Sequence, residues 1–218
     1  MTKFVNCPPS FTPLFEAVEA RVAKLLDDRV WDTDTGAHFV AGERYVMFRA
    51  ESMAVSVREE LEKLLGSSTD TAIYKIGKAI GASDCRYIAG RFPDLSPEQK
   101  LAMGPISFAL SGFAHSTVRE ESNPVPDDSY LLFIEHPNSF EAESFKRKGI
   151  ATSKTVCWLT AGYSAGWCSE AMGIQLDTRE VSCTARGDDK CIFVMCPQKK
   201  LREVAKELCA KHGLPDPW

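Results

Sequence analysis

Residues 175–196 of this 218-residue chain read QLDTREVSCTARGDDKCIFVMC. We expect two strands here, at 175–184 and 191–196, separated by a polar run that neither strand can bury. The run Arg186-Gly187-Asp188-Asp189 predicts a tight turn, so that the two strands form an antiparallel hairpin. Such a hairpin would bring Cys183 and Cys191 close together.

The hairpin lies in the part of the chain that is richest in cysteine. Five of the eight cysteines fall between residues 157 and 196, at Cys157, Cys168, Cys183, Cys191 and Cys196. Thiolate is a soft ligand that suits zinc, and a carboxylate such as that of Glu180 can complete a tetrahedron.

Strand geometry limits this idea, because positions i and i+3 face opposite sides of a regular strand. Glu180 and Cys183 can share a metal only if the strand is bulged or if Cys183 lies beyond its end. Two alternatives stay open from the spacing alone: buried core cysteines, and a disulfide between Cys183 and Cys191.

The other segments predict helices interspersed with strands. Amphipathic spacing predicts a helix at 11–27, and Ser96, Pro97 and Gln99 form a strong helix start, although Gly104-Pro105 should bend or split that helix. Further helices are expected at 52–65, 69–92, 139–148, 154–173 and 199–211, and further strands at 43–50, 117–121 and 130–135. The pattern predicts an α+β fold, with a mainly antiparallel sheet covered by helices. We divide it into an N-terminal helical segment, 1–36, with a possible dimer contact, and a single domain, 37–218.

Composition excludes several classes of protein. With 44% hydrophobic residues and a formal net charge of -4, the composition predicts a globular domain. It lacks the excess positive charge that attracts nucleic acid. The N-terminus lacks the features of a secretory signal, and no run of 18 apolar residues predicts a membrane span. We therefore expect a cytoplasmic, reducing environment, in which free thiols persist.

One motif is typical of an enzyme but stands in the wrong context. Residues 162–166, GYSAG, match the G-x-S-x-G pattern of esterases, which requires a strand, a strained turn and a helix. Here the match lies inside an apolar helical stretch, so we expect Gly162 and Gly166 to form a flat helix face that another element or a ligand approaches closely. No nicotinamide or flavin fingerprint is present, and the sequence leans away from an enzyme without excluding one.

Several motifs in chain order resemble the 4-vinyl reductase domain family, most closely the sensor domains of XylR- and DmpR-type aromatic-responsive activators. They are residues 157–166 (CWLTAGYSAG), 179–183 (REVSC) and 187–191 (GDDKC), with further similarity at 47–58, 104–110 and 139–143. The resemblance covers residues 40–197. It implies the ligand-binding fold shared by NO-signalling and Golgi-transport (TRAPP-like) proteins.

The resemblance also implies a structural zinc ion (Zn2+) held by Cys157, Glu180, Cys183 and Cys191, next to a pocket for small hydrophobic or aromatic molecules. Nearby Arg179, Arg186 or Lys190 could offset the excess negative charge of such a site. Cys168 and Cys196 are the alternative ligands.

The implied pocket would be lined by residues from several elements: Ile106, Phe108, Phe113, Leu132, Phe133, Ile134, His136, Trp158 and Tyr163. Phenol sensors of the family have a His at the position of Phe108 and a Trp at the position of His136. This chain departs at both places, and we expect the polar anchor to have moved to His136, which puts phenol itself in doubt. Plain core packing is the alternative for these residues, and an exposed turn position before Pro137 is the alternative for His136.

The sequence thus predicts a stand-alone, zinc-containing, aromatic-ligand-binding sensor or carrier, expected to be a homodimer. Because the sensor relatives continue into further domains and this chain ends at Trp218, a regulatory role would act through a separate regulator or enzyme. The alternatives are an accessory protein or reductase component in tetrapyrrole (bacteriochlorophyll) metabolism, and an assembly scaffold without ligand.

Overall fold

The stretch quoted above forms a hairpin at the edge of a five-stranded sheet. In the computed structural model, which describes residues 2–216 and 218, the strand order is β1-β5-β6-β8-β7. The strands are β1 (Val5–Asn6), β5 (Ser116–Val118), β6 (Leu132–His136), β7 (Leu176–Ser182) and β8 (Cys191–Pro197). All neighbouring pairs are antiparallel except β1 and β5, so the predicted α+β fold with a mainly antiparallel sheet is confirmed.

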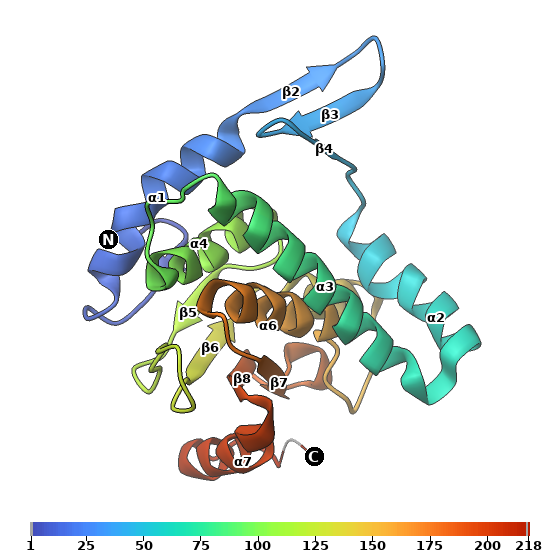
Figure 1. Ribbon diagram of the computed structural model, residues 1–218. Coiled ribbons are helices and arrows are strands. Elements are labelled where there is room, and N and C mark those ends of the chain that lie inside the picture. The colour runs from blue at the N-terminus through green and yellow to red at the C-terminus, as the bar shows by residue number, and fades with distance from the viewer. Residues whose placement is uncertain (1, 217) are drawn as a thin grey trace.

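Helices cover both faces of this sheet (Figure 1). On one face α6 lies against β7, with α3 and α4 beside it and α1 packed on α4, whereas α7 covers the other face. The longer helices are α1 (Thr12–Asp27), α2 (Val57–Leu65), α3 (Thr69–Gly90), α4 (Pro97–Leu110), α5 (Phe140–Lys148), α6 (Trp158–Met172) and α7 (Leu201–His212). Short helical turns are η1 (Ser52–Ser56, a π-helix), η2 (Gly66–Ser68), η3 (Thr184–Arg186) and η4 (Gln198–Lys200). None of the helices in the described part of the chain is long and apolar enough to cross a membrane.

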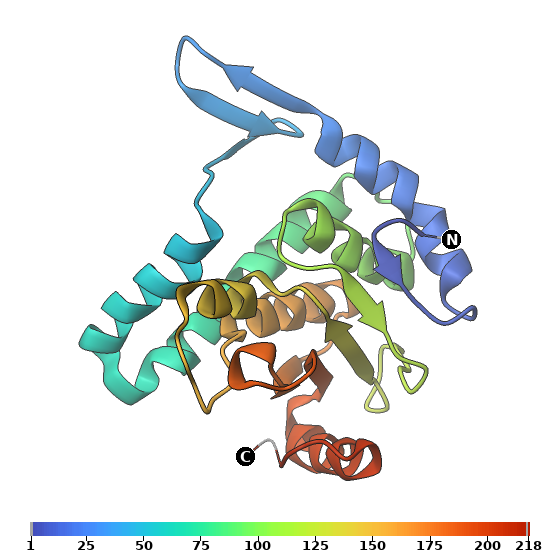
Figure 2. The same ribbon diagram turned by 180° about the vertical axis from the view of Figure 1, so that it is seen from behind.

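A second, smaller sheet projects from the body of the molecule (Figures 1 and 2). Its three strands, in the order β2-β3-β4, are β2 (Arg29–Asp32), β3 (Ala37–Val40) and β4 (Glu43–Tyr45). The sequence predicted neither β2 nor β3, and the strand expected at 43–50 ends at Tyr45, where its pairing with β3 ends. The boundary drawn between residues 36 and 37 falls inside this sheet, between β2 and β3, while β1 pairs into the main sheet.

The N-terminal helix α1 uses its apolar stripe within the chain. Phe15, Val18, Val22 and Leu26 are all buried, and α1 packs against α4. The face that suggested pairing with a second copy is therefore already covered by the chain itself.

Helix α4 runs unbroken from Pro97 to Leu110 and does not split at Gly104-Pro105. Ser96 and Gln99 exchange hydrogen bonds of 3.3 and 3.0 Å at its start, which confirms the predicted capping box. Gly104 lies flat against the Trp167 ring of α6, whose Nε1 donates to the carbonyl of Lys100. This packing holds the helix together across the proline.

Helices α3 and α6 cross with their backbones in contact. A Cβ added to Gly162 or Gly166 would overlap the backbone of α3, and one added to Gly77 or Gly81 would overlap the backbone of α6. The flat helix face predicted at 162–166 is therefore confirmed, and the covering element is α3.

Candidate functional site: a thiolate cluster beside an apolar cavity

Four buried side chains converge where helix α6 meets the β7–β8 hairpin. Cys157 stands at the N-cap of α6, Glu180 lies near the end of β7, Cys183 follows β7, and Cys191 opens β8. Their ligand atoms, one from each residue, all lie within 4.8 Å of one another. The hairpin turn and the start of a helix thus bring together the four residues that the sequence resemblance singled out.

The strand geometry that raised a difficulty is resolved at the end of β7. Glu180 pairs with Phe193 and Ser182 with Ile192, so the register shifts between Glu180 and Ser182 in a bulge. Because β7 ends at Ser182, Cys183 also lies beyond the strand. Both conditions that allow Glu180 and Cys183 to face one centre are met.

Hydrogen bonds inside the cluster leave one oxygen free. Oε2 of Glu180 accepts from the backbone N–H of Cys157 at 2.9 Å, whereas its Oε1 is buried without a hydrogen-bond partner. The sulfurs of Cys157 and Cys191 are 3.9 Å apart. Burial raises the pKa of the Glu180 carboxyl and of the Cys157 thiol, while thiol donors from Cys157 and Cys183 lower the pKa of Cys191 to about 5. Charge on a buried carboxyl and three buried thiols is unfavourable, so these groups must either keep their protons or bind a cation.

This donor set fits zinc. Two sulfurs at about 2.3 Å from one tetrahedral zinc ion lie about 3.8 Å apart, close to the separation of Cys157 and Cys191. The unpartnered Oε1 of Glu180 supplies a fourth donor. Four protein ligands would close the site, which is typical of a structural rather than a catalytic zinc ion. All eight cysteines are free thiols, so the alternative disulfide between Cys183 and Cys191 is absent.

The turn after Cys183 orders the cluster. Asp188 accepts the backbone N–H of Cys183 at 2.7 Å and pairs with Arg186 at 2.6 Å, and the N–H of Thr184 points at the sulfur of Cys191 at 3.4 Å.

The other two cations considered as charge compensators have partners elsewhere. Lys190 pairs with Glu135, and Arg179 lies over the rings of Trp158 and Trp218. The alternative ligands also lie outside the cluster, since Cys168 faces the cavity described below and Cys196 packs under α7.

A carboxylate from another helix caps the start of α6. The two oxygens of Glu141 on α5 accept the N–H groups of Leu159 and Thr160, at 3.1 and 2.8 Å. These are the positions that an N-cap side chain usually satisfies, and the Cys157 side chain makes no such bond. Burial raises the pKa of Glu141 to about 7.

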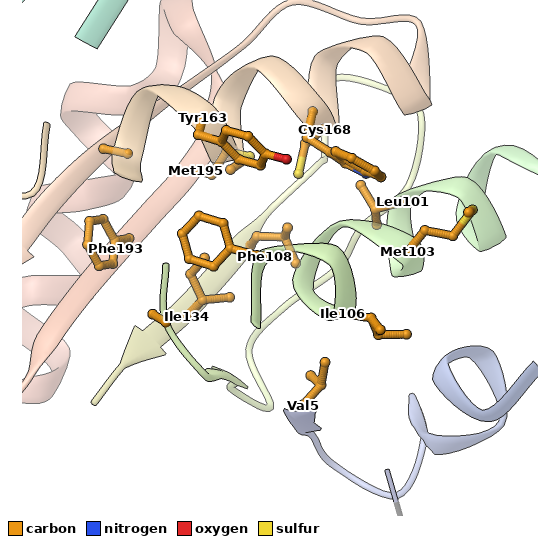
Figure 3. Close-up of a cluster of buried hydrophobic side chains, with 14 of the residues drawn as sticks. Val5, Leu101, Met103, Ile106, Phe108, Ile134, Tyr163, Cys168, Phe193 and Met195 are labelled. Atoms are coloured by element: carbon orange, nitrogen blue, oxygen red, sulfur yellow. The ribbon is translucent and has the colours of Figure 1, made fainter. Parts of the chain in front are cut away.

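An apolar cavity of about 50 Å³ lies between α4, α6, α1 and the main sheet. Figure 3 shows part of its lining, with Phe108 and Tyr163 facing each other above Ile134, and with Cys168 and Leu101 to one side. Its lining includes Phe11, Leu14, Phe15, Leu101, Ala102, Gly104, Pro105, Phe108, Leu132, Ile134, His136, Tyr163, Ser164, Trp167, Cys168 and Met195.

The structure divides the predicted pocket residues into two groups. Phe108, Leu132, Ile134, His136 and Tyr163 line the cavity. The remaining four, Ile106, Phe113, Phe133 and Trp158, do not.

Each of those four has a physical reason to lie elsewhere. Phe133 alternates with Leu132 and Ile134 along β6, so it faces α7 and packs under Arg119. Ile106 points away from Phe108 toward Val5 (Figure 3). The Phe113 ring packs against those of Phe108 and Tyr163, at 4.8 and 4.9 Å between centroids, without lining the cavity. Trp158 donates to the carbonyl of Thr155 beneath Arg179.

Sequence reasoning missed the cavity residues Trp167, Cys168 and Met195. Trp167 follows Tyr163 by four positions on α6, and Cys168 follows the cavity residue Ser164 by four, a helical spacing that could have identified both. Phe11, Leu14 and Phe15 were missed because the N-terminal segment was treated as separate from the domain.

His136 is the last residue of β6 and is 1% exposed, so it is not a turn residue in solvent. Its ring lies 5.1 Å from that of Phe108 and 4.5 Å from that of Phe193, measured between centroids. Burial lowers the pKa of its imidazole to about 3, which keeps the ring neutral at physiological pH. Nδ1 is buried without a hydrogen-bond partner. A neutral imidazole nitrogen without a partner, on the wall of an apolar cavity, suits a ligand with one polar group.

Fold and site define a class of protein: a helix-covered, mainly antiparallel α+β domain with a buried thiolate–carboxylate cluster beside an apolar cavity. Residues 138–197 match the 4-vinyl reductase domain, and residues 27–122 match the family described as activator of aromatic catabolism. Each match covers less than half of the chain, and together they confirm the resemblance predicted from its motifs.

Individual relatives agree with this resemblance. The chain is 26% identical over 179 residues to the transcriptional regulatory protein XylR of Pseudomonas putida, an alignment that covers 78% of this chain. It spans about a third of the length of that regulator, 32%. The phenol-responsive sensory domain of the transcription activator PoxR, solved with phenol, aligns with a TM-score of 0.74 and 21% identity over 88% of this chain and 96% of that one. This likeness supports the fold.

Two other solved structures align less well. A vinyl-4-reductase family protein from Methanocaldococcus jannaschii has a TM-score of 0.43 and 17% identity, over 86% of this chain and 94% of that one. A trafficking protein particle complex subunit 3 from Naegleria fowleri, covalently bound to palmitic acid, has a TM-score of 0.47 and 14% identity, over 70% and 97%.

Proposed function

We propose that this chain is a sensor or carrier domain that binds a small aromatic molecule with one polar group in the cavity between α4, α6 and the sheet. The observation that carries the proposal is the unpartnered Nδ1 of His136, buried on the wall of an otherwise apolar cavity. The names of the relatives, a regulator and a phenol-responsive sensory domain, support the same class of ligand.

Cavity size argues for one ring rather than several. A cavity of about 150 Å³ is known to hold benzene in another protein, whereas ligand pockets for larger molecules measure about 300–1,000 Å³. The space here, about 50 Å³, must therefore widen even for one ring. The Phe108 ring lines the cavity, with its centroid 4.8, 5.1 and 5.5 Å from those of Phe113, His136 and Tyr163, so a turn of this one side chain would change the space available. This size favours a single aromatic ring over a tetrapyrrole.

We further propose that a structural zinc ion joins Cys157, Glu180, Cys183 and Cys191. The ion would tie the start of α6 to the β7–β8 hairpin, and it would balance the negative charge that these ligands acquire when they lose their protons to bind it. The eight free thiols suit a reducing compartment such as the cytoplasm.

Calorimetric titration with phenol, benzyl alcohol and toluene tests the ligand proposal. The three molecules share one ring and differ in the presence and the reach of a hydroxyl group. We expect at least one hydroxyl-bearing ligand to bind more tightly than toluene by about tenfold, the contribution of one hydrogen bond. Equal affinities for all three would remove His136 as the anchor, and no binding of any would overturn the proposed function.

Native mass spectrometry of the protein tests the metal in the same sample. We expect one zinc ion per chain, released on acidification as the thiolates take up protons. A metal-free protein with full thermal stability would overturn the structural role of zinc.

A further inference from the structure

Ser139 occupies the N-cap position of α5 without capping that helix. A serine at this position usually accepts a backbone N–H from two or three residues further on, but the Ser139 side chain makes no such bond. It is 2% exposed, and its Oγ instead donates to the sulfur of Cys157 at 3.2 Å. A buried hydroxyl that departs from the usual local pattern to contact a candidate metal ligand indicates a functional role.

The backbone on both sides of Ser139 is held in place. Before it, the side chain of Asn138 accepts the N–H of His115 at 3.0 Å. After it, the N–H of Phe140 donates to the carbonyl of Phe113 at 3.0 Å. These bonds anchor the segment to the end of α4 and the start of β5, so the hydroxyl stays directed at the sulfur.

The same short segment reaches α6 a second time. Two residues after Ser139, the carboxyl of Glu141 accepts the N–H groups of Leu159 and Thr160. The start of α5 thus contacts both the thiol that begins α6 and the first backbone donors of that helix. The N-terminal ends of both helices, where the backbone dipoles favour negative charge, therefore lie beside the sulfur of Cys157.

A zinc ion in the cluster would leave an excess of negative charge, because three thiolates and a carboxylate exceed the charge of one Zn2+. The three cations near the hairpin have other partners. Arg186 pairs with Asp188 at 2.6 Å. Lys190 pairs with Glu135 at 2.8 Å, and Arg179 lies over two indole rings. Neutral hydrogen-bond donors are therefore left to offset much of the excess.

Such donors reach three of the four ligand groups. They are the Ser139 O–H on the Cys157 sulfur at 3.2 Å, the Thr184 N–H on the Cys191 sulfur at 3.4 Å, and the Cys157 N–H on the Glu180 carboxyl at 2.9 Å. Of these three bonds, only the first is made by a side chain, so a substitution can remove it. Groups that hydrogen-bond to metal ligands orient them, and their loss typically weakens metal binding by about 10–100-fold.

We propose that Ser139 is a positioning residue of the metal centre. Its hydroxyl donates to the Cys157 thiolate, holds that sulfur toward the ion and offsets part of its charge. The inference rests on the zinc ion proposed above. It extends the metal centre to α5, an element that carries none of the four ligands.

Zinc affinity of the full chain tests this role. The zinc content of the unaltered chain is measured first, and its affinity follows from competition with a chromogenic chelator. We expect Ser139→Ala to bind zinc about tenfold more weakly. Ser144→Ala is the matched control, because Ser144 is also buried on α5 but donates to the carbonyl of Phe140 within its own helix. It should keep the affinity of the unaltered chain.

The absorption spectrum of the Co2+-loaded chain separates a contact with the thiolate from a general effect on folding. Loss of a hydrogen bond raises the energy of the sulfur electrons, so the thiolate-to-cobalt charge-transfer band should move to longer wavelength in Ser139→Ala. Ser139→Gly should show the same shift, since helix N-caps tolerate glycine well. Ser139→Thr keeps the hydroxyl and should restore the band and the zinc affinity.

The outcomes distinguish this inference from the metal on which it depends. A zinc-free unaltered chain would overturn both. If the unaltered chain binds zinc, and Ser139→Ala and Ser139→Gly keep its affinity and its cobalt band, only the role of Ser139 is overturned. Equal losses in Ser144→Ala, or a Ser139→Thr variant that behaves like Ser139→Ala, would show that packing of α5 and not the hydroxyl is responsible, and would overturn it as well.

Discussion

Two buried features lie along α6, about two turns apart, and they differ in polarity. At the start of the helix, Cys157 joins a cluster whose four ligand groups are all polar and lie within 4.8 Å of one another. Further along, Tyr163 and Trp167 line a cavity in which one orphan nitrogen, on His136, stands among apolar groups. The two regions adjoin in the sheet, because His136 of β6 lies opposite Cys191 of the neighbouring strand β8. The cluster crowds four polar groups into a small buried volume, whereas the cavity has one polar group for which the chain supplies no partner.

The largest expected effect comes from breaking the cluster. Cys183→Ser keeps the size of the side chain but removes a soft ligand, so we expect loss of bound zinc and of several kcal/mol of stability. Elemental analysis and thermal unfolding measure both. Cys209→Ser changes a buried cysteine of α7, outside the cluster, and this matched control should keep its zinc. Retention of zinc and of thermal stability in Cys183→Ser would contradict the ligand assignment.

Enlarging the cavity should lower the free energy of unfolding somewhat less than breaking the cluster. Phe108→Ala removes a ring that is 3% exposed, which should lower the free energy of unfolding by about 3–5 kcal/mol. The space left behind should bind benzene or toluene, and a saturating ligand should then recover part of the loss. Phe133→Ala is the control, because its ring packs under α7 on the opposite face. A similar recovery in Phe133→Ala would show that the effect does not arise in the cavity.

The capping carboxyl between the two regions predicts a pH effect. The pKa of Glu141 is raised to about 7 in the folded chain from an ordinary value of about 4.5, so the folded state holds this proton more tightly. Stability from this group is therefore full below pH of about 4.5 and falls by up to about 3 kcal/mol as pH rises through 7. Denaturant unfolding of Glu141→Gln should lack this component. If the difference between the two proteins did not change with pH, the raised pKa would be wrong.

The smallest effect should come from the orphan nitrogen. His136→Phe fills the same wall without a polar atom, so affinity for a hydroxyl-bearing ring should fall about tenfold while affinity for toluene stays the same. Calorimetry measures both, with His115→Phe as the control at a position outside the cavity lining. Equal losses for both ligands would indicate a change of shape and not a lost hydrogen bond.

The sequence allowed most of the main sheet and the long helices to be predicted, because hairpin signals and capping residues act locally. The four residues of the cluster came from the family resemblance, since their spacing alone left buried core cysteines or a disulfide open. The capping role of Glu141 was not predicted, although the residue lies in one of the family motifs, because the N–H group that it accepts belongs to a helix 18 residues further along the chain. The small sheet was missed because β2 and β3 bury little apolar surface and carry no strong pattern. Phe133 was placed in the cavity although strand alternation with Ile134 puts it on the other face. Strand parity was applied to Glu180 and Cys183 and would have corrected this too.

The crossing of α3 and α6 has a mechanical consequence. With glycines at Gly77, Gly81, Gly162 and Gly166, no layer of side chains separates the two backbones, so no rotamer change can absorb sliding between them. We expect the two helices to move together as one rigid unit. Tyr163 is hydrogen-bonded to Asp84 on α3, and further along α3 Tyr87 holds the carbonyl of Ala41 at the base of the small sheet. We therefore expect a displacement of α6 at the cavity wall to move α3 with it and to reach that base.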